Sequence, residues 1–135
     1  MLTVVERVLL LQDMDILDSA RTEDLAKFAA ICREIEVPAG TILFREGESS
    51  RTLHLLIRGR VSLEANSGET TVVERGGVDI WSFFADTEQQ YTAQALEECL
   101  FLMVSFEEME DLLTAEPELC WAITRRLALI VTRSQ

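Results

Sequence analysis

The segment from Pro38 to Val61 constrains the fold more than any other part of the chain. Two short apolar runs in it, Thr41–Phe44 and Leu53–Ile57, have the length of β-strands and are bounded by turn residues. This pattern favours buried strands over a helix. Three glycines punctuate the segment: Gly40, Gly47 and Gly59. Glycine supplies the positive φ or close backbone approach that the corners of a tightly wound sheet need, so the segment predicts a β-roll or barrel.

Further strand signals follow along the chain. Val61–Ala65 and Thr70–Glu74 are separated by a turn that contains Asn66 and Gly68, which indicates a hairpin. The last predicted strands are Tyr91–Ala95 and Cys99–Val104. The predicted fold class is α+β, mainly β: an antiparallel β-roll or jelly-roll-like barrel flanked by N-terminal and C-terminal helices.

Helix signals lie on both sides of the predicted roll. Thr3 and Glu6 have capping-box spacing, and Thr22 begins a second apolar helical pattern. Pro117 suits the first turn of a last helix, from Glu118 to about Val131. We therefore predict one domain over 1–135, with N-terminal helices in 1–36, the β-roll in 37–105 and C-terminal helices in 106–135.

Composition limits the classes of protein that remain. The 135 residues are 48% hydrophobic, enough for a core, and no apolar run is long enough to cross a bilayer. No basic region precedes the first apolar stretch, so we expect no secretory signal and no membrane insertion. Three widely spaced cysteines, Cys32, Cys99 and Cys120, are expected to be buried reduced thiols in a cytoplasmic protein.

The charge balance bears on nucleic-acid binding. Twelve Lys and Arg are outweighed by twenty-four Asp and Glu, which gives a formal net charge of −12. Neutralising DNA or RNA phosphates needs a basic face, and Arg125-Arg126 is the only adjacent basic pair. We therefore expect no nucleic-acid binding by this chain on its own.

Two stretches carry a family resemblance. Pro-Ala-Gly-Thr-Ile-Leu-Phe-Arg-Glu-Gly-Glu at 38–48, followed by Leu-Leu-Ile-Arg-Gly-Arg-Val at 55–61, resembles the first half of a cyclic-nucleotide-binding domain. Such domains occur in catabolite activators and in protein kinase regulatory subunits. The resemblance implies a regulatory or signalling domain rather than an enzyme, with cAMP or cGMP as its ligand.

The family's phosphate-binding cassette corresponds to the stretch between Gly76 and Ala95. In the family, a Gly-Glu pair opens a short helix, and an arginine precedes a small residue and the next strand. Helix-end amides and the arginine hold the cyclic phosphate, and the glutamate accepts from the ribose hydroxyl. Here Trp81 and Ser82 occupy the Gly-Glu positions and Gln89 falls where the arginine belongs.

The cassette therefore looks shortened and degenerate. No Lys or Arg occurs between Arg75 and Arg125, and Asp79 and Glu88 would repel a phosphate. We expect cAMP or cGMP to bind weakly or not at all. The candidate pocket residues are Gly77, Ile80, Trp81, Ser82, Phe83, Phe84, Gln89, Gln90, Tyr91 and Thr92.

Two alternatives concern the aromatic residues of this stretch and the single histidine. Trp81, Phe83 and Phe84 either floor a pocket for an uncharged or aromatic ligand or, as we favour, plug the empty cassette and complete the core. His54 is the only histidine, so we expect a local hydrogen bond rather than a metal site, and we predict neither metal nor catalytic residues.

Two functions remain open. The first is a sensor that binds a cyclic nucleotide or another small molecule and moves its C-terminal helices. The second is an interaction or dimerisation module that docks to a partner or linked effector protein. A homodimer would use the C-terminal helix, whose apolar residues cover more than one face. In related transcription factors this helix leads into a helix-turn-helix, whereas this chain ends at Gln135, so we expect no DNA reading by it.

Overall fold

The computed structural model describes residues 1–134. It divides the chain into two compact units. The helical unit comprises Met1–Cys32 and Glu107–Gln135, and the β unit comprises Arg33–Phe106. Each unit is described by itself below.

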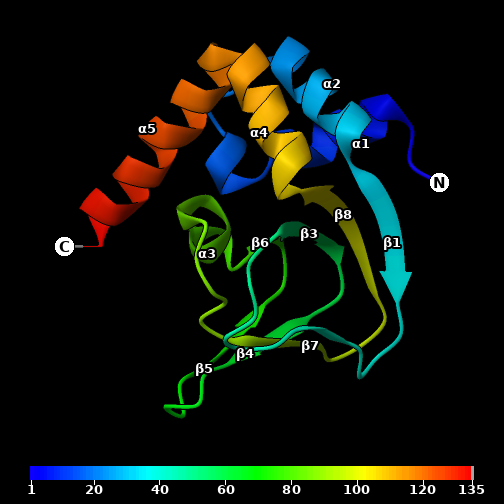
Figure 1. The fold of residues 1–135 in the computed structure, drawn as a ribbon. Coiled ribbons are helices and arrows are strands. Elements are labelled where there is room, and N and C mark those ends of the chain that lie inside the picture. The colour runs from blue at the N-terminus through cyan, green and yellow to red at the C-terminus, as the bar shows by residue number, and fades with distance from the viewer. Residues whose placement is uncertain (135) are drawn as a thin grey trace. The chain divides into compact units, whose positions relative to one another are not determined.

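The helical unit contains four α-helices and one 3-10 turn (Figure 1). They are α1 (Val4–Gln12), η1 (Asp15–Leu17), α2 (Thr22–Ile31), α4 (Phe106–Ala115), whose first residue belongs to the β unit, and α5 (Pro117–Arg133). The helix starts predicted at Thr22 and Pro117 are confirmed. No helix in residues 1–134 has the length and apolar character needed to span a membrane.

Side chains complete the ends of the first two helices. Thr3 Oγ1 accepts from the backbone N–H of Glu6 at 3.1 Å, and Glu6 Oε1 accepts from that of Thr3 at 2.9 Å, which confirms the capping box. Arg7 Nη1 donates to the carbonyl oxygens of Ala29 and Cys32 at 3.1 and 2.8 Å. These contacts fix α1 against the C-terminal end of α2, where carbonyls lack helical partners.

α5 is held to the rest of the helical unit by ion pairs. Arg126 Nε donates to the Asp15 carboxylate at 2.7 Å and to the Asp15 carbonyl at 3.0 Å, which ties α5 to η1. Lys27 of α2 contacts Glu116, just before α5, at 2.6 Å. These pairs are mostly exposed, so they orient the helices more than they stabilise them.

The β unit folds as two four-stranded antiparallel sheets (Figure 1). One has the order β1-β8-β3-β6 and the other β2-β7-β4-β5. The strands are β1 (Arg33–Val37), β2 (Ile42–Phe44), β3 (Thr52–Arg58), β4 (Val61–Glu64), β5 (Thr70–Val73), β6 (Gly76–Val78), β7 (Thr92–Ala95) and β8 (Cys99–Ser105). The roll is therefore confirmed, and its sheets remain open rather than closing into a barrel.

Two strands differ from the sequence-based expectation. β1 begins at Arg33, inside the span 1–36 assigned to helices, because residues 33–37 pair with β8 from Arg33↔Met103 to Val37↔Cys99. β6 was not expected, because two glycines in three residues give no alternating pattern. It is nevertheless fixed by pairing with β3, His54 opposite Val78.

The core of the β unit lies between the two sheets. Its buried residues come from both sheets: Phe44, Leu56, Val61, Leu63, Val78, Ala93, Ala95, Cys99 and Phe101. Gly59 turns the chain from β3 into β4 with φ +113°, and a Cβ there would lie 2.5 Å from Cys99 Sγ. The corner glycine is therefore required by both backbone and packing.

The cysteines are all free thiols. Cys32 and Cys99 are buried as expected, whereas Cys120 is only partly buried, because it lies near the exposed start of α5. Burial raises the pKa of Cys32 to about 12, so this thiol stays protonated and unreactive.

Candidate functional site

The stretch between β6 and β7 contains one short helix, α3 (Ile80–Ala85). Asp79 caps it from a left-handed conformation with φ 54° and is only 8% exposed. Its carboxylate accepts from the Ser82 hydroxyl at 2.7 Å, from the Ser82 N–H at 3.3 Å and from the Gln90 N–H at 3.4 Å. The N–H and hydroxyl donors of Ser82, in the first turn of α3, therefore already face the chain's own carboxylate.

Gln89 lies in a loop that pairs with the turn between β2 and β3. Its N–H donates to the Glu48 carbonyl at 2.7 Å, and its carbonyl accepts from the Gly47 N–H at 2.9 Å. The Gln89 side chain is 4% exposed, and its Oε1 has no hydrogen-bond partner. The residue that falls at the family's arginine position is therefore buried in the roll.

Tyr91 immediately precedes β7 and faces an acidic environment. Its hydroxyl donates to Glu69 Oε2 at 3.0 Å, and this hydrogen bond raises the pKa of Tyr91. A cavity of about 270 Å³ lies here, lined by Glu46, Ala65, Ser67, Glu69, Gln90 and Tyr91. Two carboxylates and no cation line it, so it disfavours anions.

The remaining predicted residues act locally. Thr92 Oγ1 accepts from the Glu46 N–H at 3.1 Å, and Gln90 Nε2 donates to the Glu88 carbonyl at 3.2 Å. Ile80 covers Gly77 so closely that a Cβ on this glycine would lie 2.0 Å from Ile80 Cγ2.

The three aromatic residues of α3 have different environments. Phe83 is buried and packs edge-on against Phe84 and Phe106, with ring centroids 5.2 and 5.6 Å apart. Trp81 is 45% exposed. The prediction that these aromatics plug the cassette therefore fits Phe83 and is wrong for Trp81, because the short helix turns position 81 outward.

A second cavity of the β unit, called here the roll cavity, has a volume of about 290 Å³. Its lining comes from β2, β3, β8 and the loops between them: Leu43, Phe44, Glu48, Ser49, Arg51, Thr52, His54, Gln89 and Met103. Sequence reasoning found only Gln89 among these as a candidate, because tertiary structure brings residues 43–54 together with Gln89 and Met103.

His54 is the polar residue of β3 that faces the interior. It is 7% exposed, and its ring lies 5.9 Å from that of Phe44 and 5.7 Å from that of Phe101. Burial lowers the pKa of His54 to about 4, and a backbone hydrogen bond with Thr52 opposes this shift. The imidazole is therefore neutral at pH 7, and its Nδ1 has no hydrogen-bond partner.

Comparison with known proteins assigns the family. A family profile described as cyclic nucleotide-binding domain matches residues 34–116. The chain belongs to the cyclic nucleotide-binding domain family. No curated protein matches this domain.

Solved structures share the fold of this cyclic nucleotide-binding domain. The N-terminal domain of a transcriptional regulator from Streptomyces coelicolor A3(2) is 23% identical, with a TM-score of 0.80 over 96% of this chain and 92% of that one. Thermus thermophilus catabolite activator protein is 19% identical, with a TM-score of 0.72 over 89% of this chain and 57% of that one. The regulatory domain of Toxoplasma gondii PKA, crystallised with cAMP, is 18% identical, with a TM-score of 0.73 over 81% of this chain and 44% of that one. The domain thus spans about half the length of the last two chains.

Three arginines of the β unit, Arg51, Arg58 and Arg60, face acidic partners. Arg51 Nη1 lies 2.9 Å from Asp86 and stacks over Phe106 at 4.3 Å, while Arg60 Nε lies 3.2 Å from Glu97. Arg58 lies 3.9 Å from Glu36. Within residues 1–134, no group of three His, Cys, Asp or Glu side chains is placed to hold a metal ion.

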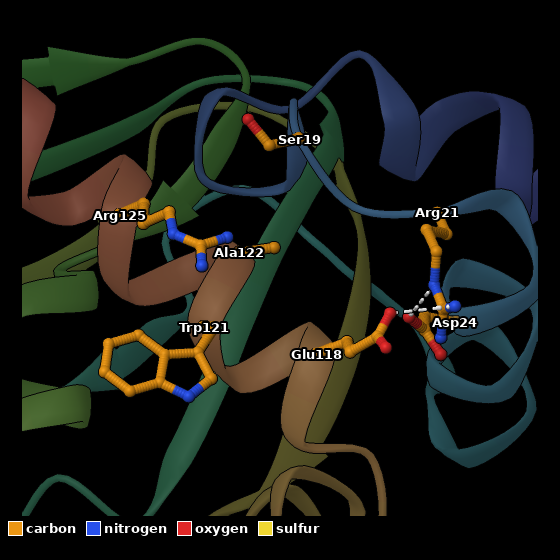
Figure 2. Close-up of a pocket in the computed structure, with 7 residues that line it drawn as sticks. All are labelled: Ser19, Arg21, Asp24, Glu118, Trp121, Ala122 and Arg125. Carbon is orange, nitrogen blue, oxygen red and sulfur yellow. Dashed lines mark hydrogen bonds and ion pairs between the residues drawn. The ribbon is translucent and has the colours of Figure 1, made fainter.

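The helical unit has a cavity of its own, about 420 Å³ in volume. Figure 2 shows its lining residues: Ser19, Arg21, Asp24, Glu118, Trp121, Ala122 and Arg125. Arg21 contacts Asp24 at 3.1 Å and Glu118 at 2.8 Å, and Arg125 lies over the Trp121 ring at 5.8 Å. The charged residues that line this cavity largely pair with one another, so the cavity favours neither anionic nor cationic ligands.

Proposed function

We propose that this is a regulatory domain that binds cAMP and cGMP weakly or not at all and responds to a different signal. The observation that carries this proposal is the Asp79 carboxylate, which accepts from the Ser82 hydroxyl and N–H in the first turn of α3 and from the Gln90 N–H in the loop before β7. A cyclic phosphate would have to displace this carboxylate and remain next to it. Two like charges about 4 Å apart repel by roughly 1 kcal/mol in water and 4 kcal/mol near a protein surface.

The missing cation adds to this penalty. Gln89 and Tyr91, in the segment that leads into β7, are both uncharged at neutral pH. The Tyr91 hydroxyl already donates a hydrogen bond to Glu69. A hydrogen bond to a charged group contributes about 1.5–3 kcal/mol, which is roughly a tenfold to hundredfold loss in affinity. Loss of the arginine and repulsion by Asp79 together make a micromolar site marginal.

Thermal melting with cyclic nucleotides tests the proposal. A ligand present at about 100 times its Kd stabilises the folded state by about 2.7 kcal/mol, which would raise Tm by several degrees. We expect millimolar cAMP and cGMP to leave Tm unchanged, relative to 5′-AMP as the matched control. A shift of several degrees with either cyclic nucleotide and not with 5′-AMP would show that the proposal is wrong.

We also propose that the domain is not an enzyme and works inside the cell. The regulatory character of the family supports the first point. His54, the single histidine, is buried and neutral, which leaves it poorly placed as a general base. Three free thiols fit a reducing compartment such as the cytoplasm.

A second candidate function, an interaction module, is favoured by the exposed apolar residues of α5. Trp121 is 59% exposed, Leu129 43% and Val131 46%. If a homodimer or an effector uses this helix, Leu129→Asp should abolish the association without unfolding the domain, because the side chain is exposed. Leu96→Asp is the matched control, since Leu96 is also 43% exposed but lies in the β unit. Light scattering after size exclusion measures the outcome, and an association that survives Leu129→Asp would place the interface elsewhere.

A further inference from the structure

The cavity of the helical unit, called here the helical cavity, carries opposite charges at its two ends. Its volume of about 420 Å³ is within the range of small-molecule sites. Two arginines and two carboxylates line it, so the formal charges of the lining cancel: Arg21, Arg125, Asp24 and Glu118. These charges are not evenly mixed, because three of the four residues contact one another at the end next to α2.

The end of the helical cavity next to α2 is acidic. Arg21 there contacts Glu23 at 3.1 Å, Asp24 at 3.1 Å and Glu118 at 2.8 Å. One guanidinium is thus shared among three carboxylates, which leaves this end with a negative formal charge. The Asp24 side chain is only 1% exposed, whereas that of Glu118 is 69% exposed. Glu118 is therefore the carboxylate that a ligand's ammonium group would contact.

The opposite end of the helical cavity presents a cation. Within residues 1–134, no carboxylate pairs with Arg125, whose guanidinium carbon lies 5.8 Å from the centre of the Trp121 ring. The Arg125 side chain therefore keeps its N–H donors for a ligand. A guanidinium matches the geometry of a carboxylate, which it binds through two parallel hydrogen bonds.

The geometry of α5 sets the distance between the two ends. Glu118, Trp121, Ala122 and Arg125 follow one another at the spacing i, i+3, i+4 and i+7, which places them on one face of the helix. Glu118 and Arg125 are thus attached two turns apart, about 10 Å along the helix axis. Figure 2 shows Glu118 turned toward Arg21, with Arg125 on the other side of Ala122. The Trp121 ring, whose residue is 59% exposed, gives the cavity an apolar wall.

A ligand with a single charge is attracted at only one end of the helical cavity, whereas a zwitterion of matching length is attracted at both. We propose that the helical cavity binds a zwitterion whose ammonium and carboxylate groups stand at opposite ends of an apolar body. Arg125 binds the carboxylate, Glu118 accepts from the ammonium group, and Trp121 packs against the apolar body. This proposal goes beyond the proposed function and does not rest on it, because none of the lining residues belongs to the cassette.

Four small probes test the charges and their separation. The zwitterion para-aminomethylbenzoate is compared with para-methylbenzoate and para-methylbenzylammonium, each of which lacks one charge. Phenylglycine, an isomer of the zwitterion, carries both charges on one carbon. In calorimetric titration of the unaltered protein, we expect the para zwitterion to bind saturably and at least tenfold tighter than the other three, because a hydrogen bond between charged groups is worth about tenfold to hundredfold in affinity. No saturable binding at millimolar concentration, or equally tight binding of any other probe, would overturn the proposal.

Trp121 fluorescence tests where the zwitterion binds. The chain has two tryptophans, so Trp81→Phe leaves Trp121 as the only one. We expect its emission to change with the same dissociation constant that calorimetry gives for para-aminomethylbenzoate. Saturable heat without any change in Trp121 emission would place the ligand elsewhere and contradict the proposal.

Two variants assign one charge of the ligand to each end. Arg125→Gln should weaken binding of the zwitterion at least tenfold and remove its advantage over para-methylbenzylammonium, which has no carboxylate. Glu118→Gln should likewise remove its advantage over para-methylbenzoate, which has no ammonium group. Arg133→Gln and Glu110→Gln are the matched controls, because both residues are exposed in the helical unit and do not line the cavity. They should bind the zwitterion like the unaltered protein.

The pattern of losses separates a lost contact from a disturbed fold. A disturbed helical unit would weaken all probes alike and lower Tm, whereas the proposal requires each variant to lose the preference for one charge at unchanged Tm. Undiminished binding of the zwitterion in either cavity variant would contradict the proposal. Binding of cAMP would contradict only the proposed function, because the cassette lies in the β unit and the helical cavity in the helical unit.

Discussion

The two halves of the β unit differ in how closely they follow the family. Residues 38–61 keep the corner glycines with positive φ and form strands β2 and β3, as the resemblance implies. Residues 76–95 keep the order strand, short helix, strand, yet carry Asp79 at the start of α3 and no Lys or Arg. The difference shows that backbone conformation fixes the roll, whereas a few side chains fix the phosphate site. One half can therefore lose its chemistry while the other keeps the fold.

The largest expected effect tests the fold-determining half. Gly59→Ala would force a side chain to φ +113° and place its Cβ 2.5 Å from Cys99 Sγ and 2.7 Å from the Glu98 carbonyl oxygen. Left-handed strain and overpacking together should lower the free energy of unfolding by about 3–5 kcal/mol. Gly40→Ala, where φ is +90° and no atom lies within 4 Å of the Cβ, should cost only about 1–2 kcal/mol. Urea unfolding measures both, and equal losses would mean that packing at Gly59 is unimportant.

The next effect concerns pH and the interior of the roll. Burial lowers the pKa of His54 from 6.5 to about 4, so between these values the unfolded chain binds a proton that the folded chain does not. Stability is therefore lost as pH falls from 6.5 to 4, by about 3 kcal/mol from this group.

His54→Leu removes that contribution. Carboxylates titrate in both proteins, so the quantity to measure is the difference in unfolding free energy between them at pH 7 and at pH 4.5. We expect the unaltered protein to lose more on acidification. An identical pH dependence would mean that the imidazole titrates normally.

A smaller effect tests the half that departs from the family. Asp79→Ala removes the cap of α3 and leaves the Ser82 hydroxyl and the Gln90 N–H without their acceptor, so we expect a loss of about 2 kcal/mol. Asp79→Asn keeps an acceptor oxygen and tolerates positive φ, so it should cost less than about 1 kcal/mol. If both variants are as stable as the unaltered protein, the Asp79 carboxylate does not organise this segment.

Much of the roll could be predicted from the sequence, because its signals are local. Corner glycines, apolar runs and the Thr3–Glu6 capping box each depend on a few neighbouring residues. Strands β1 and β6 could not be predicted in this way, because Arg33–Val37 is largely polar and Gly76–Val78 is very short. Both strands form by pairing with strands that are distant in the sequence.

The site was less predictable than the fold. The absence of arginine from the cassette is visible in the sequence, and so is the acidity near it. The contacts of Asp79 with Gln90 and of Tyr91 with Glu69 depend on tertiary structure. The burial of Gln89 beside His54 in one cavity joins residues 35 positions apart, the difference between 89 and 54, and no local pattern reports it.

Calorimetric titration of the domain with cAMP, and separately with cGMP, measures directly whether the cassette has lost its phosphate site. The protein is used at high concentration so that weak binding still produces heat. We expect no saturable heat, because Asp79 occupies the Ser82 donors in the first turn of α3 and no arginine lies between Arg75 and Arg125. A dissociation constant in the low micromolar range or tighter for either nucleotide would contradict this and would show that an arginine from elsewhere in the chain holds the phosphate.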